Sequence, residues 1–170
     1  MNMRQAFTVI GIFILSILLG SCLSVDPPCT RAISSRLLDV LDKARLQSDM
    51  DVIDQYLTAN NQTGVKDPSG IRYTILQQGT GESPCLESVI SASYTGRLLS
   101  TGKVFDSSVT PIDFPLTNVI IGWQLAFLKF KVGTRAVIYI PSQLAYGSNP
   151  RTNIPANSIL VFEVNFTAVK

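Results

Sequence analysis

The sequence predicts an α+β fold in which several antiparallel strands surround one short helix. From residue 71 onward, apolar residues alternate with polar ones, which is the two-residue period of strands that bury one face. The alternation is clearest between Leu160 and Ala168, near the end of the chain. In this part of the sequence only 119–130 has helical spacing, centred on 123–129. Strands therefore form the body of the predicted domain, and the helix packs on them.

Turn-forming residues separate the predicted strands. The expected elements along the chain are a strand over 71–77, a second over 89–99, a turn at Gly102 into 103–106, a short extended segment over 112–116, a strand over 134–140, a loop over 141–158 and the final strand. Gly79-Thr80-Gly81 is interpreted as a turn and not as a phosphate-binding loop, because the full spacing of such a loop is missing.

A helical region is expected ahead of this domain. Ser48 is predicted to cap a helix, because Asp51 follows three residues later as in a capping box. The apolar stripe of this helix ends near Asn60. Residues 30–47 have apolar residues near helical spacing, so their state stays open, whereas 23–29 have the prolines of a tether.

The first residues of the chain have the pattern of an exported lipoprotein. Arg4 provides a positive charge, and the following apolar stretch has the length of a signal-peptide core and is short for a membrane span. It ends in Leu19-Gly20-Ser21-Cys22, which resembles a bacterial lipobox. Cleavage then precedes Cys22, whose thiol takes a diacylglycerol. The alternative is an uncleaved anchor in which Cys22 is incidental.

The lipobox predicts a cell-envelope protein that is held in a lipid membrane by acylated Cys22. Leu23 follows where an aspartate would resemble an inner-membrane retention signal, so we expect the outer membrane, facing the periplasm. The chain then divides into a signal peptide over 1–21, a tether with the ambiguous helix over 22–47, a helix and linker over 48–70, and the main domain over 71–170.

Export also changes the meaning of the other two cysteines. Compartments outside the cytoplasm are oxidising, so Cys29 and Cys85 are a candidate disulfide that would join the N-terminal segment to the start of the main domain. The alternative is two unrelated free thiols.

The composition excludes several classes of function. The formal net charge is +2, from 14 Lys and Arg against 12 Asp and Glu, with no basic run that would bind nucleic acid. The chain has no histidine, which excludes histidine-based zinc sites and Ser-His-Asp triads. Three cysteines cannot form a four-cysteine zinc site, so we expect neither a metal nor another cofactor.

Five blocks in the second half of the chain resemble the FKBP-type peptidyl-prolyl isomerases. They are YTGRLLSTGKVFDSS (94–108), FPLTNVIIGW (114–123), KVGTRAVIYIP (131–141), LAYGS (144–148) and IPANSILVFEV (154–164). The resemblance covers 84–170 with every block in order, and it is strongest to the exported lipoprotein members. It implies an antiparallel half-barrel sheet of five to six strands wrapped on a short helix, with a helical N-terminal extension.

The resemblance also implies a proline-binding pocket. Trp123 would be its floor, Tyr94, Phe105 and Phe162 its aromatic walls, Val119, Ile120 and Ile154 its aliphatic walls, and Ile112 would stand where many members have a further aromatic. Asp106 would be the buried-edge acid, and the Tyr146 hydroxyl and the Ile120 backbone N–H would donate to substrate. Asp106, Trp123, Tyr146 and Phe162 would carry catalysis. The chain lacks the arginine that often pairs with this acid, so Asp106 would depend on Tyr94 or water.

Such a pocket can isomerise X-Pro bonds without a nucleophile or proton transfer. Rotation about a peptide bond is opposed by amide conjugation, and the twisted amide is less dipolar than the planar one. An apolar pocket would therefore favour the twisted state. The implied partners are proline-containing unfolded or exported polypeptides, with macrolide inhibitors as further ligands. The alternative is a non-catalytic chaperone or binding module that uses the same groove.

Overall fold

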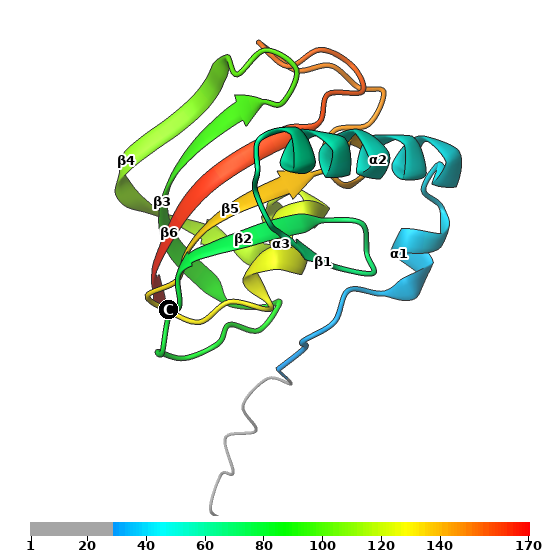
Figure 1. Cartoon of the computed structure of the whole chain (residues 1–170). Coiled ribbons are helices and arrows are strands. Elements are labelled where there is room, and N and C mark those ends of the chain that lie inside the picture. The colour runs from blue at the N-terminus through cyan, green and yellow to red at the C-terminus, as the bar shows by residue number, and fades with distance from the viewer. Residues whose placement is uncertain (1–28) are drawn as a thin grey trace, which may run out of the picture.

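The computed structural model describes residues 29–170. Six antiparallel strands form one sheet in the order β1-β2-β5-β6-β3-β4 (Figure 1). The strands are β1 (Val65–Lys66), β2 (Arg72–Gln77), β3 (Val89–Leu98), β4 (Val104–Pro115), β5 (Arg135–Ile140) and β6 (Leu160–Val169). The helices are α1 (Ser35–Asp39), α2 (Lys43–Ala59) and α3 (Ile121–Phe127), with short 3-10 turns η1 (Leu116–Asn118) and η2 (Ser142–Leu144). The predicted α+β class and the sheet wrapped on a short helix are confirmed.

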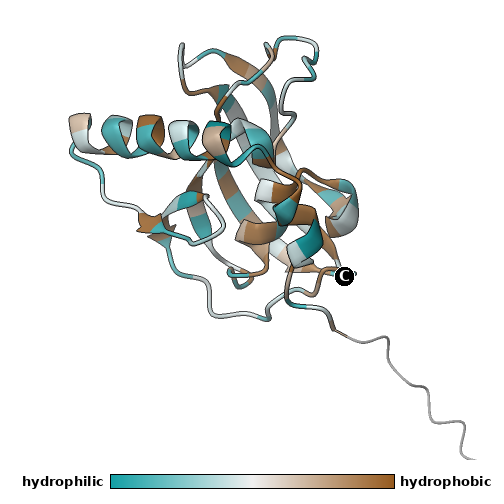
Figure 2. Cartoon of the chain, turned by 90° about the vertical axis from the view of Figure 1, so that its right-hand side faces the viewer, coloured by the Kyte–Doolittle hydropathy of each residue, from teal (hydrophilic) through white to brown (hydrophobic). Residues whose placement is uncertain are grey.

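The two longer helical elements cover opposite faces of the sheet (Figure 1). α3 packs in the main core, where Phe127 lies 5.2 Å from Phe166 of β6 between ring centroids. α2 packs on the other face, where Ile53 and Leu57 meet Tyr139 of β5. Successive side chains of a strand point to opposite faces, so Ile138 of β5 packs in the main core while its neighbour Tyr139 packs against α2. Hydrophobic and hydrophilic residues follow one another along the strands in Figure 2.

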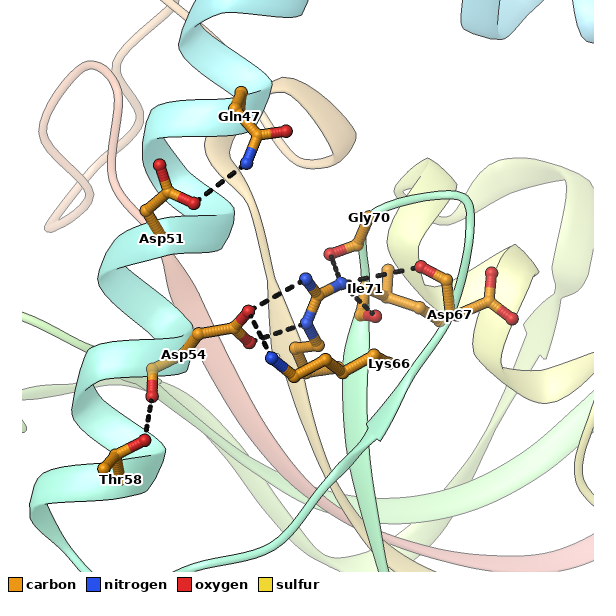
Figure 3. Close-up of polar contacts among 9 residues, drawn as sticks. Gln47, Asp51, Asp54, Thr58, Lys66, Asp67, Gly70 and Ile71 are labelled. Atoms are coloured by element: carbon orange, nitrogen blue, oxygen red, sulfur yellow. Dashed lines mark hydrogen bonds and ion pairs between the residues drawn. The ribbon is translucent and has the colours of Figure 1, made fainter.

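Ion pairs add to the docking of α2 at one end of the sheet. Asp54 of α2 accepts hydrogen bonds from the Arg72 guanidinium, the Nε contact being 2.8 Å, and from Lys66 Nζ at 2.8 Å (Figure 3). Arg72 is only 6% exposed, so this carboxylate neutralises a nearly buried cation. The Arg72 hydrogen bond is the main cause that lowers the pKa of Asp54 below its usual value, and Lys66 contributes further.

The start of α2 differs from the predicted one. Asp42, and not Ser48, caps the helix, and its carboxylate accepts a hydrogen bond from the Arg45 backbone N–H at 3.0 Å. Ser48 therefore lies inside the helix. The end is as predicted: Ala59 is the last helical residue, and Asn60 follows as the C-cap. Part of the ambiguous segment, from Ser35 to Asp39, forms the five-residue helix α1.

Most predicted strands agree with the observed ones within about two residues, but one pair does not. The separate extended segments 103–106 and 112–116 are parts of the single strand β4. A register shift against β3, between the pairs Ala92–Ile112 and Tyr94–Ser108, bends this strand and interrupts its alternation. The two-residue strand β1 was not predicted, because so short a segment has no period to detect.

A disulfide joins Cys29 to Cys85, with 5.1 Å between their Cα atoms. Beside it, the Leu86 backbone N–H donates to the Thr30 carbonyl at 2.8 Å. The bond therefore ties the segment ahead of α1 to the loop before β3. The predicted signal peptide and Cys22 lie outside the described residues. Within 29–170, no helix combines the length and the hydropathy needed to cross a membrane.

Candidate active site

An apolar cavity of about 290 Å³ opens between β3, β4, β6 and the start of α3. Its lining consists of aromatic and aliphatic side chains with a few polar ones: Tyr94, Phe105, Asp106, Phe114, Asn118, Val119, Ile120, Trp123, Tyr146 and Phe162. A concave, mostly apolar cavity with few polar groups is the usual form of a small-ligand site.

Trp123 lies at the centre of an aromatic cluster at the base of this cavity. It is 4% exposed, and its ring makes edge-to-face contacts with Tyr94, Phe114 and Phe162, each with centroids 5.3 Å apart. Such pairs stabilise beyond the area that they bury. Three strands thus hold one indole ring from three sides.

Two glycines permit close contacts around this cavity. A Cβ at Gly122 would overlap the Ile140 side chain, so its absence lets α3 approach β5 closely. A Cβ at Gly96 of β3 would lie 2.7 Å from the Phe105 ring and 2.8 Å from the Phe162 ring. The two rings therefore cross directly over the Gly96 backbone, where they pack edge to face at 5.5 Å.

Asp106 is held by Tyr94, whose hydroxyl donates to Oδ2 at 2.7 Å. The Asp106 side chain is exposed, whereas the family resemblance implies an acid at a buried edge. It projects from β4, which is the last strand of the sheet that residues 29–170 form. Burial of the Tyr94 ring, together with this hydrogen bond and the charge of Asp106, raises the pKa of Tyr94 far above its usual value. The phenol therefore remains a hydrogen-bond donor at neutral pH.

Tyr146 reaches the cavity from the loop that follows η2. Its ring is half-buried, and the Arg151 guanidinium stacks over it at 5.2 Å from the centroid. Val119 and Ile120, which also line the cavity, form the turn into α3. The Gln124 side chain donates to the Val119 carbonyl at 2.9 Å and so fixes that turn. The sequence offers no signal for this role of Gln124.

Two of the predicted pocket residues do not line the cavity. Ile112 is 40% exposed, because it adjoins the register shift of the edge strand β4. Phe114, two residues further on, packs against Trp123 and takes the place of the wall aromatic. Ile154 is 6% exposed but lines a neighbouring cavity with Leu98, because its backbone pairs with Arg151 in a tight loop.

The other predicted pocket residues come together as expected from the resemblance. They are Tyr94, Phe105, Asp106, Val119, Ile120, Trp123, Tyr146 and Phe162. Phe114 and Asn118 are additional lining residues. The sequence could have indicated a lining role for Phe114, which is an aromatic residue in an extended segment. It gives no such indication for Asn118.

This geometry defines a class of protein. The sheet wrapped on one helix presents an aromatic-floored pocket whose carboxylate is engaged by a tyrosine, which suits the binding of a small apolar ring. Within 29–170 no three His, Cys, Asp or Glu residues gather as a metal centre would require.

Comparison with known proteins identifies the family. The sequence pattern of the FKBP-type peptidyl-prolyl cis-trans isomerases matches residues 81–167. The chain is 46% identical to the peptidyl-prolyl cis-trans isomerase Mip of Coxiella burnetii over 121 residues, which is 68% of this chain and 52% of that protein. It is 35% identical to the outer membrane protein MIP of Legionella longbeachae over 125 residues, covering 69% of this chain and 52% of that one.

A solved structure agrees with this match. The peptidyl-prolyl cis-trans isomerase of Pseudomonas syringae superposes with a TM-score of 0.64 at 31% identity, covering 73% of this chain and 95% of that one. The chain therefore belongs to the FKBP-type peptidyl-prolyl cis-trans isomerase family. It spans about half the length of the curated relatives named above.

Proposed function

We propose that the protein is a peptidyl-prolyl cis-trans isomerase that rotates X-Pro bonds in exported polypeptides. The observation that carries the proposal is the pocket floored by Trp123 and walled by Tyr94, Phe114 and Phe162. Its size and apolar walls suit a pyrrolidine ring. The names of the matched relatives from Coxiella burnetii and Pseudomonas syringae support the same activity.

The pocket lowers the barrier by differential binding. The barrier of about 18–20 kcal/mol arises from amide conjugation, which is lost in the twisted state. Proline held against Trp123 places its amide in surroundings with few water molecules. The less dipolar twisted amide loses less there than the planar one, so the pocket binds the transition state more tightly.

Hydrogen-bond donors at the rim hold the chain that flanks the proline. The Tyr146 hydroxyl and the Ile120 backbone N–H are our candidates, since both residues line the cavity. Tyr94, which stays protonated, keeps the Asp106 carboxylate at the rim in one position. Fixed donors contribute orientation without any proton transfer.

We also propose that the protein acts in the cell envelope, anchored by a lipid on Cys22. Two observations support an envelope location. The disulfide between Cys29 and Cys85 is typical of oxidising compartments. One relative is named an outer membrane protein in Legionella longbeachae.

An isomerisation assay on the full chain tests the activity. The uncatalysed X-Pro bond relaxes in tens to hundreds of seconds, so catalysis is seen as a faster exponential with a proline peptide. We expect catalysis in the wild type and its loss in Trp123→Ala, with circular dichroism to check that the variant is folded. A folded wild type that binds the peptide but leaves its relaxation unchanged would favour the non-catalytic binding module.

A further inference from the structure

One carboxylate of α2 lies in the face that this helix turns toward the rest of the domain. Asp49 is 2% exposed and falls in line with Leu46, Ile53 and Leu57, the apolar residues of that face. A charged group at such a position is stable only when it is paired and hydrogen-bonded. The groups that bond the Asp49 carboxylate therefore indicate its structural role.

The partners of Asp49 lead to the loop over 141–158. Its Oδ2 accepts from the Ser142 backbone N–H at 2.8 Å and from the Ser142 hydroxyl. Its Oδ1 lies 3.0 Å from Arg45 Nε, and Arg45 Nη2 donates to the Asn157 carbonyl at 2.9 Å. One face of α2 thus holds the loop at both its start and its end.

Tyr146 lies between these two fixed points. The Gly147 backbone N–H donates to the Ser142 carbonyl at 2.8 Å, and the Asn157 N–H donates to the Gly147 carbonyl at 2.8 Å. The residue that follows Tyr146 is therefore bonded to both residues that α2 holds. A chain of hydrogen bonds therefore runs from α2 to Gly147, the neighbour of Tyr146.

We propose that Asp49 is a positioning residue for Tyr146. By fixing Ser142, it holds the loop in the conformation that brings the Tyr146 hydroxyl to the pocket. The inference rests on the proposed function, because it assigns Asp49 a part in isomerisation. It makes the helical extension a support of the pocket, although α2 packs on the opposite face of the sheet and contributes no residue to the lining.

A double-mutant cycle on the full chain tests the proposal. Asp49→Ala is expected to lower kcat/KM for a proline peptide about 10-fold, because small misplacements of a binding group are costly. In the Tyr146→Phe background the same substitution is expected to cost less than about twofold, since the hydroxyl that it misplaces is already gone. If the loss of kcat/KM in the double variant equals the product of the two single-variant losses, Asp49 and Tyr146 act independently, and the proposal is overturned.

Asp54→Ala is the matched control. It also removes a carboxylate of α2, but Asp54 holds Arg72 and Lys66 and has no bond to the loop (Figure 3). We expect its kcat/KM to stay at the wild-type value. Asp49→Asn keeps an oxygen that Ser142 can bond and is expected to recover most of the activity. An equal loss of kcat/KM in Asp54→Ala and Asp49→Ala would overturn the proposal, because it would show that any loosening of α2 lowers activity.

A second readout does not depend on activity. We expect the Gly147 amide to exchange with solvent faster in Asp49→Ala than in the wild type, and the ring resonances of Tyr146 to shift. If both stay unchanged, Asp49 does not position the loop, even in an active enzyme. If the wild type itself has no isomerase activity, the proposed function fails, and these signals still show whether the link to Tyr146 exists. Should Asp49→Ala not fold, Ser142→Ala removes one bond from the other side and enters the same cycle.

Discussion

Gly96→Ala is predicted to damage the pocket through two ring contacts. The new Cβ would lie 2.7 Å from the Phe105 ring and 2.8 Å from the Phe162 ring, where ordinary contacts begin at 3.4 Å. The rings must therefore retreat by at least 0.7 and 0.6 Å, which are the differences between these distances. Phe162 is 5% exposed and lies against Trp123, so it has little space to move. Phe105, at the rim, must move outward.

The magnitude follows from two opposing effects. Overpacking of this kind costs about 1–3 kcal/mol, and alanine in a strand recovers about 0.5–1 kcal/mol relative to glycine. We therefore expect the free energy of unfolding to fall by about 0.5–2 kcal/mol, measured by urea denaturation. A displaced wall should also lower kcat/KM about tenfold in the peptide isomerisation assay.

Gly64→Ala provides the control for this substitution. Its Cβ would meet the nearest atom, Leu57 Cδ1, at 3.3 Å, and it lies on the face of the sheet away from the pocket. We expect activity to be unchanged there. Wild-type stability and wild-type kcat/KM in Gly96→Ala would refute the reasoning, because they would show that the two rings are free to move.

Three further predictions follow from the same contacts. Phe114→Ala should lower kcat/KM about tenfold, whereas Ile112→Ala should change it less than about twofold, because only Phe114 lines the pocket; peptide kinetics on both variants decide this. Reducing the bond between Cys29 and Cys85, which are 56 residues apart, should lower the free energy of unfolding by about 4 kcal/mol in the chain-entropy model, measured by urea denaturation with and without reductant. Because the folded-state pKa of Asp54 lies below its unfolded value near 3.8, its stabilisation is present above that pH and is lost as the pH falls through the folded value. The drop in stability between pH 5 and pH 2 should therefore be smaller in Asp54→Asn, and equal drops would contradict the role of Arg72.

The sheet could be predicted from the sequence because its strands have one strongly apolar face. Between Leu160 and Ala168, the side chains that alternate inward are large, so the period is unmistakable. The beginning of α2 could not be fixed in the same way. Asp42 and Ser48 both have good capping side chains, and the choice depends on distant contacts such as that between the Asp42 backbone N–H and Gln143 Oε1 at 3.3 Å.

The pocket residues could be predicted where a strand is regular, because alternation then tells which side chains point to the same face. Ile112 does not line the cavity because of the register shift in β4, which arises from pairing with β3 and is not revealed by local spacing. The burial of Asp49 is hidden for the same reason. Its partner Ser142 is 93 residues away, and an aspartate on a helix otherwise indicates a solvent-facing position.

The two outermost strands have a consequence for the proposed binding of unfolded polypeptides. An open strand edge offers unpaired N–H and C=O groups on which another polypeptide can aggregate. Here one edge, β1, is only two residues long. The other, β4, carries Pro111 and Pro115, which have no N–H to donate, and is bent by its register shift. The β4 edge is thereby a poor template for intermolecular β-pairing, so an unfolded polypeptide can meet the aromatic pocket beside β4 without extending the sheet there.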